Sequence, residues 1–268
     1  MALNLNQSEK YVVYPAEGTA PNTEQMPLLI ADSRVPLNMS EAMDARLDFI
    51  GTDTQDSWYG NYFDLGDALF YNPNGNVKVI LDAQVLRELN PKSRLDNGAL
   101  VLEDSMYESF EGVEFTRDDL QKAITGKALT RKQAKSHPVW QTLARNQARL
   151  DKYVDATFDL AKEKFSYDQN MGLYISNIPK KDNARLWCLS WLNDRSSAYA
   201  WYGLDYSSGR LVGVEKSAVG TAKNLDSDKV IQYTTRESEE AISELRRAEE
   251  FFRPEAFAKT KSLLTRLQ

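Results

Sequence analysis

Alternating apolar and polar positions predict a β-hairpin at about residues 68–81. In the stretch DALFYNPNGNVKVILD, two alternating runs flank Asn74 and Gly75. An Asn-Gly pair readily adopts the positive φ angles that a tight hairpin turn requires. Other short apolar runs rich in β-prone residues predict strands at residues 11–14, 27–31, 98–103 and 210–214.

A helical period dominates the middle of the chain. Leu143, Leu150, Val154, Phe158 and Ala161 recur at intervals of three, four or seven residues, which places them on one face of a helix. This pattern predicts a long helix over residues 138–165 that turns one side to the core. The run ARLWCLSWL at residues 184–192 is apolar on nearly every side, and we interpret it as a helix inside the fold. Shorter helices are expected over 41–49, capped by Asn38 or Ser40, and from Thr130 onward.

The C-terminal part of the chain has a different pattern. Residues 217–227 are small and polar, which is typical of a linker. Beyond them, apolar stripes at helical spacing predict two helices over 237–252 and 254–267. These helices either close the protein's own core or provide a surface for self-association or for a protein partner.

Together these elements predict an α+β fold. We expect a small antiparallel sheet packed by the long helix at about 138–165, with a C-terminal helical extension. The domain organisation that follows is a single α+β domain over residues 1–216, then a linker and a helical pair over 217–268.

Composition narrows the class of protein. The 268 residues are 42% hydrophobic and carry a formal net charge of -6, as expected for a globular protein that does not coat nucleic acid or membrane. One cysteine, Cys188, excludes an internal disulfide, and with one histidine it excludes a conventional zinc site. No apolar run approaches the roughly 18 residues that would span a bilayer. We therefore expect a cytoplasmic protein without a cofactor and without a membrane segment.

A basic segment interrupts this acidic chain. No Asp or Glu lies between Asp119 and Asp151, whereas seven cationic side chains do: Lys122, Lys127, Arg131, Lys132, Lys135, Arg145 and Arg149. Near a helix N-terminus they could bind an anion, with His137 as a proton donor and Trp140 as a stacking surface. The alternative, which charge runs usually favour, is a solvated surface that pairs with the chain's own acidic stretches.

Three further groups of residues are candidates for chemistry. Asp64 and Asp67 beside the run SWYGNYF could hold Mg²⁺, although aspartates near turns more often cap the backbone. Trp201 and Tyr202 could contact a ligand through their rings, with core packing as the alternative. Cys188 lies in an apolar run that would raise its pKa and leave it unreactive. A phosphate-binding loop around Lys127 is excluded, because it lacks the required glycine and hydroxyl residues.

These observations leave three hypotheses for function. The first, favoured by the absence of a catalytic motif, is a non-catalytic cytoplasmic binding protein that recognises a protein partner or an anionic ligand. The second is a phosphate-directed enzyme or a nucleic-acid binder that uses residues 122–149. The third is a structural or assembly subunit joined through the C-terminal helices.

Overall fold

The computed structural model describes residues 5, 10–103, 105–116, 118–120 and 128–215. The predicted linker and C-terminal helices at 217–268 lie outside the described residues. So do Lys122 and Lys127 of the basic segment.

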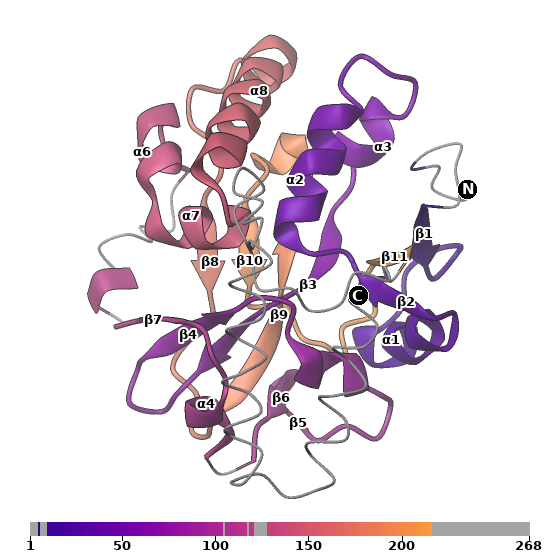
Figure 1. The fold of residues 1–268 in the computed structure, drawn as a ribbon, viewed down its shortest axis with the longest axis vertical. Coiled ribbons are helices and arrows are strands. Elements are labelled where there is room, and N and C mark those ends of the chain that lie inside the picture. Colours follow the sequence, from indigo (N-terminus) through magenta and orange to yellow (C-terminus); the bar gives the residue numbers. More distant parts are fainter. Residues whose placement is uncertain (1–4, 6–9, 104, 117, 121–127, 216–268) are drawn as a thin grey trace, which may run out of the picture. The chain divides into compact units, whose positions relative to one another are not determined.

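The described residues form an eleven-stranded mixed sheet (Figure 1). Along its main path the strand order is β1-β11-β3-β9-β10-β8, with β2 on β11, β4 on β3, β7 on β4, and β6 and β5 beyond β9. The pairs β11–β3 and β10–β8 are parallel, and the other pairs are antiparallel. The strands are β1 (Tyr11–Tyr14), β2 (Arg34–Pro36), β3 (Phe63–Tyr71), β4 (Val77–Ile80), β5 (Leu95–Asp96), β6 (Ala99–Val101), β7 (Val113–Phe115), β8 (Leu173–Ile175), β9 (Asn183–Leu189), β10 (Ala198–Ala200) and β11 (Leu211–Glu215).

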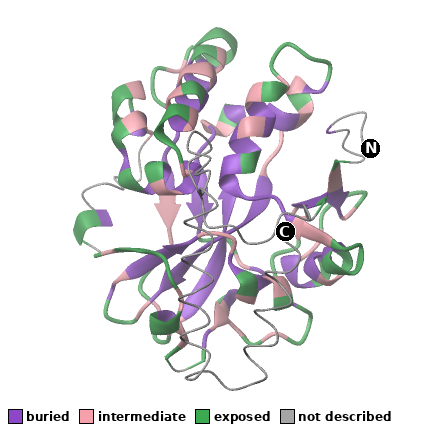
Figure 2. Cartoon of the chain, viewed as in Figure 1, coloured by how far each residue is buried: buried purple, intermediate pink, exposed green. Residues whose placement is uncertain are grey.

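The two central strands, β3 and β9, are buried along their whole length (Figure 2). Trp187 and Leu189 of β9 belong to one apolar cluster, whereas Ala184 and Leu186 belong to another. Because successive side chains of a strand point to opposite faces, the two clusters lie on the two faces of the sheet. The sheet is therefore covered on both sides, which explains why its central strands are apolar throughout.

Helices cover both faces. The first cluster contains residues of α2, α7 and α8, and the second contains residues of α1, the 3₁₀ helix η1 and α4. Among the described residues, no helix is both long enough and apolar enough to cross a membrane. The helices are α1 (Asn22–Ala31), α2 (Met39–Asp48), α3 (Gln55–Tyr59), η1 (Gln84–Glu88), α4 (Met106–Ser109), α6 (Arg131–Ser136), α7 (Pro138–Ala144), α8 (Gln147–Phe165) and η2 (Leu192–Asp194).

Several local predictions are confirmed. The hairpin consists of β3 and β4, paired from Ala68↔Ile80 to Tyr71↔Val77. Asn38 caps α2 through a reciprocal arrangement with Glu41, in which each side chain accepts a hydrogen bond from the other residue's backbone amide. These features depend on neighbouring residues, so the local sequence is sufficient to predict them.

The predicted fold class is wrong. The structure has a large mixed sheet of eleven strands in place of a small antiparallel sheet packed by one long helix. Residues 184–192 were expected to be helical, but residues 184–189 belong to the buried strand β9. An apolar run this short has no period that separates a buried helix from a buried strand. Residues 27–31, expected to be a strand, end helix α1, whose Met26 and Leu29 pack against the sheet.

The long helix is also interrupted. Arg145 has a φ of 61°, in the left-handed region, and separates α7 from α8. The side chain of Asn146 then caps α8 by accepting a hydrogen bond from Arg149 N. The guanidinium of Arg145 forms ion pairs with Asp67 and Asp82, both at 2.8 Å, so tertiary contacts hold this break.

A fully buried arginine joins the helical layer to the sheet. Arg46 of α2 donates hydrogen bonds to the carbonyl oxygens of Trp58, Asn61 and Ser190 and to the hydroxyl of Tyr153. None of these acceptors is a carboxylate. Arg46 therefore fixes the chain just after β9, where Ser190 lines the pocket described next.

Candidate functional site

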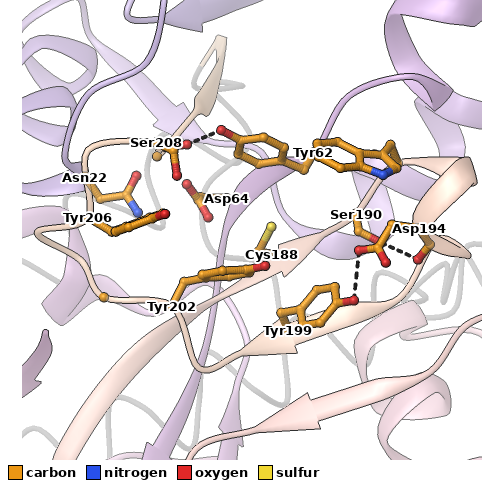
Figure 3. Close-up of a pocket in the computed structure, with 13 residues that line it drawn as sticks. Asn22, Tyr62, Asp64, Cys188, Ser190, Asp194, Tyr199, Tyr202, Tyr206 and Ser208 are labelled. Carbon is orange, nitrogen blue, oxygen red and sulfur yellow. Dashed lines mark hydrogen bonds between the residues drawn. The ribbon is translucent and has the colours of Figure 1, made fainter. Parts of the chain in front are cut away.

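A pocket of about 280 Å³ lies where β3 and β9 meet the loop before β11 (Figure 3). Asp64 and Cys188 are register partners on β3 and β9 and lie side by side in it. Helix α1 contributes its first residue, Asn22. The lining residues are Asn22, Tyr62, Asp64, Cys188, Ser190, Trp191, Asp194, Tyr199, Tyr202, Gly203, Tyr206, Ser208 and Gly209.

Aromatic rings form two walls of this pocket (Figure 3). On one side, the rings of Tyr62 and Trp191 meet edge to face at 5.5 Å between centroids. On the other side, a continuous series of ring contacts runs from Tyr174 through Tyr199, Trp201 and Tyr202 to Tyr206. We call these seven residues the aromatic surface: Tyr62, Tyr174, Trp191, Tyr199, Trp201, Tyr202 and Tyr206.

Much of the aromatic surface is accessible to solvent. Trp201 and Tyr206 are 46% and 54% exposed, and Trp191 and Tyr202 are also exposed. Large aromatic side chains usually bury most of their area in a core, so four exposed rings around one pocket are unusual. Core packing, the alternative weighed for Trp201 and Tyr202, does not describe them.

The loop that carries Trp201 and Tyr202 is held by buried hydrogen bonds. Arg185 of β9 donates from Nη1 to both of their carbonyl oxygens, at 3.0 and 2.8 Å, and from Nη2 to Asn97 O. Gly98, at φ 74°, lies so close that a Cβ there would approach the Cα of Gly203 to 2.6 Å. The loop backbone is thus fixed before any ligand arrives, which lowers the entropic cost of binding.

Asp64 is a buried carboxylate that forms no salt bridge with any cation of the described residues. It is 5% exposed, and its Oδ2 accepts a hydrogen bond from Arg210 N at 2.8 Å. Burial raises the pKa of Asp64 to about 6. Hydrogen bonds from Arg210 N, Asn22 and Cys188 favour the charged form and partly oppose this rise. Burial also raises the pKa of the Cys188 thiol, and the negative charge of Asp64 adds to this effect.

Two more hydrogen-bond acceptors face the pocket. Asp194 Oδ2 accepts a hydrogen bond from the hydroxyl of Tyr199 at 2.8 Å. Asn22 is 3% exposed, and its Oδ1 has no hydrogen-bond partner among the described residues. Neither Asp64 nor Asp194 forms a salt bridge within the described part of the chain. The lining residues include no Lys, Arg or His, so the pocket is rich in acceptors and carries negative charge.

The basic segment does not form an unneutralised patch. Arg131 pairs with Asp155 and Asp159, and Lys135 also pairs with Asp155, on one face of α8. Arg145 pairs with both Asp67 and Asp82, Arg149 pairs with Asp44, and Lys132 is exposed. Four of the seven cations thus pair with the chain's own aspartates, as in the alternative that charge runs usually favour. The acids come from segments distant in sequence, which the local gap in acidic residues could not reveal.

The aromatic and histidine candidates of the basic segment are buried. Trp140 is fully buried, and its indole donates to Met171 O at 2.8 Å, so it offers no surface for stacking. His137 is 5% exposed, and its Nδ1 accepts a hydrogen bond from Val139 N, which caps α7. One backbone N–H of the helix N-terminus that was expected to bind an anion is thus already occupied by His137.

The two magnesium candidates do not converge. Asp64 is the register partner of Cys188, whereas Asp67 lies in the irregular stretch of β3 between Asp64 and Ala68. Asp67 accepts hydrogen bonds from Met39 N and Asp82 N and pairs with Arg145, whereas Asp64 faces the pocket. Among the described residues, no group of three or more His, Cys, Asp or Glu side chains could hold a metal ion.

The structure thus places only some of the predicted site residues close together. Tyr202 and Asp64 line the same pocket, and Trp201 stacks beside it on Tyr199. Sequence reasoning missed Asn22, Tyr62 and Asp194 as site residues. They lie far apart in the chain and have no common spacing, so no local signal could have grouped them.

Comparison with known proteins gives a fold. No protein-family model matches the chain, and no curated protein matches its sequence. The structure is similar to a solved structure from work on the accommodation of massive sequence variation in Nanoarchaeota by the C-type lectin fold. The two share 16% sequence identity with a TM-score of 0.57, over 79% of this chain and 100% of the other. The likeness shows the fold alone, and it replaces the predicted fold class with a C-type lectin-like fold.

Proposed function

We propose that this chain is a binding protein that recognises a protein partner through the aromatic surface and its pocket. The observation that carries the proposal is the exposure of four aromatic side chains at one cavity: Trp191, Tyr202 and Tyr206 line it, and Trp201 stacks beside it on Tyr199. Tyr and Trp dominate the energetics of protein interfaces, because they bury a large area with few rotatable bonds. The C-type lectin-like fold supports this choice, since the similar structure is described as accommodating massive sequence variation.

The chemistry of the pocket supports a protein partner over an anionic ligand. Its acidic residues, Asp64 and Asp194, would repel a phosphate or carboxylate group. The cations expected to attract an anion are paired with aspartates elsewhere. Hydrogen-bond acceptors at the bottom of an aromatic pocket suit a partner that brings donors.

Selection from random peptides displayed on phage would test the proposal with the intact chain. We expect peptides selected on the wild type to lose about 30-fold or more in affinity for Trp201→Ala or Tyr206→Ala, the loss typical of an interface hot spot. Leu28→Ala is the matched control, because Leu28 is 56% exposed on α1 but is not part of the aromatic surface. Circular dichroism would verify that each variant is folded.

Two results would overturn the proposal. The first is a selection that yields no peptide specific for the wild type. The second is a set of binders that Leu28→Ala weakens as much as Trp201→Ala does, since the aromatic surface would then have no particular role.

A further inference from the structure

The pocket has an unusual combination of aromatic walls and unsatisfied acceptors. Two carboxylates, Asp64 and Asp194, have no cationic partner in contact among the described residues. A buried acceptor left without a hydrogen bond costs about 1–3 kcal/mol, so an oxygen at a cavity wall without a partner favours binding of a donor that enters the cavity. Asn22 Oδ1 is such an oxygen, because the side chain is buried and that atom has no partner in the described residues.

The orientation of Asn22 follows from its neighbour. Hydrogen bonding from Asn22 to the Asp64 carboxylate requires the amide NH₂ to face Asp64. The Oδ1 atom is then turned away from Asp64, beside Gly209, where a Cβ would approach it to 2.8 Å. Figure 3 shows Asn22 beside Tyr206 and Asp64 at one end of the pocket.

We infer that this pocket receives the guanidinium group of an arginine side chain carried by the protein partner. The inference rests on the proposed function and names the chemistry that the same pocket takes. A guanidinium is planar, stacks on aromatic rings and presents five N–H donors at its edge. Inside the pocket it would stack on the tyrosine rings and bring N–H donors and positive charge to a lining whose acceptors include Asn22 Oδ1, Asp64 and Asp194.

The charges around the pocket favour a cation. Arg210 is a positive group that acts on the charge of Asp64; its guanidinium lies over the Tyr62 ring at 5.2 Å and donates to Asn61 Oδ1 at 2.7 Å. Arg210 is not among the residues that line the pocket.

Titration of the protein with two amino acids whose amino and carboxyl groups are blocked tests the inference directly. N-acetyl-arginine methylamide and N-acetyl-citrulline methylamide have nearly the same shape, but only the first is charged. We expect the arginine probe to bind about tenfold or more tightly, measured by changes in the amide NMR spectrum of the intact chain. Equal binding of the two probes, or no binding of either, would overturn the inference.

Variants place the interaction at the pocket. Asp64→Asn and Asp194→Asn are each expected to weaken the arginine probe by about fivefold or more, because each removes one negative charge beside the guanidinium. Asp159→Asn is the matched control, since it removes the same charge from the exposed face of α8. Equal weakening by all three variants would indicate a long-range effect of net charge and would contradict a pocket site.

The pH dependence gives a second signature. Asp64 has a pKa of about 6, so the wild type should lose affinity for the arginine probe as pH falls from 7.5 to 5. The ionisable groups that act on Asp64 are Tyr62, Cys188 and Arg210, and burial raises the pKa values of Tyr62 and Cys188, which moves both further above that range. The loss should be reduced in Asp64→Asn; an unchanged pH profile would contradict the assignment.

The two proposals can fail separately. Peptides selected on the wild type that depend on Trp201 and Tyr206 but tolerate replacement of every arginine by citrulline would keep the binding function and exclude the arginine pocket. Peptides that are insensitive to the aromatic surface would exclude the binding function itself.

Discussion

Replacing Asp64 with asparagine is expected to stabilise the folded protein at neutral pH. Burial raises the pKa of this carboxyl from its ordinary value of 3.8 to about 6. Each pKa unit corresponds to about 1.4 kcal/mol, so keeping Asp64 ionised in the folded state costs about 3 kcal/mol. Asparagine removes the charge but keeps one acceptor oxygen for Arg210 N, and the loss of one other hydrogen bond costs about 1 kcal/mol. The expected net gain at pH 7 is about 2 kcal/mol.

The gain should disappear in acid. A carboxyl whose pKa is higher in the folded state favours folding most when it is protonated in both states, below about pH 4. This contribution is lost as pH rises through about 6, where the folded protein must ionise a buried group. The variant has no such ionisation, so the difference between variant and wild type should grow from pH 4 to pH 7.

Urea unfolding followed by tryptophan fluorescence at pH 4, 5, 6 and 7 would measure this difference. Asp159→Asn is the control, because its carboxylate is exposed on α8 and its replacement should change stability by well under 1 kcal/mol. A difference between Asp64→Asn and wild type that is the same at every pH would refute the reasoning. Destabilisation at pH 7 would show that the hydrogen bonds of Asp64 outweigh its desolvation.

Three further predictions concern buried polar groups. Asp67→Asn should destabilise the protein by about 3 kcal/mol, because it leaves the mostly buried Arg145 with only the partly exposed Asp82 as its partner. Urea unfolding would measure this loss, and an unchanged unfolding midpoint would contradict the prediction. Arg46→Met should lower the free energy of unfolding by about 3 kcal/mol or more, since several buried carbonyl oxygens lose their hydrogen-bond donor. A variant as stable as the wild type would show that water replaces the guanidinium. Cys188 should react with iodoacetamide only as urea unfolds the protein; rapid alkylation of the native state would contradict its burial and raised pKa.

Local sequence was sufficient for some elements of this fold. The Asn-Gly pair predicted the β3–β4 hairpin, and Asn38 with Glu41 marked the start of α2. In each case the deciding interaction lies within a few residues. The run of apolar residues in β9 was correctly predicted to be buried, but its strand structure depends on pairing with β3, β6 and β10, which no local pattern contains.

The site depended on tertiary structure in the same way. The sequence indicated a concentration of aromatic residues that includes Trp201 and Tyr202, and these lie at the aromatic surface. It also indicated a basic segment, whose cations the fold pairs with acids from α2, α8 and β3. Long-range electrostatic pairing is decided by which segments the sheet brings together, so charge spacing along the chain could not predict it.

The sequence by itself determined a globular chain with a β-hairpin, an amphipathic helical region in its middle and too few Cys and His residues for a conventional zinc site. Tertiary structure decided the eleven-stranded sheet, the break at Arg145 and the meeting of Asn22, Asp64 and Asp194 at one pocket. The physical reason is the separation along the chain of the residues that interact. Turns and caps are set by neighbours along the chain, whereas strand pairing, ion pairing and pocket formation are set by residues that only folding brings into contact.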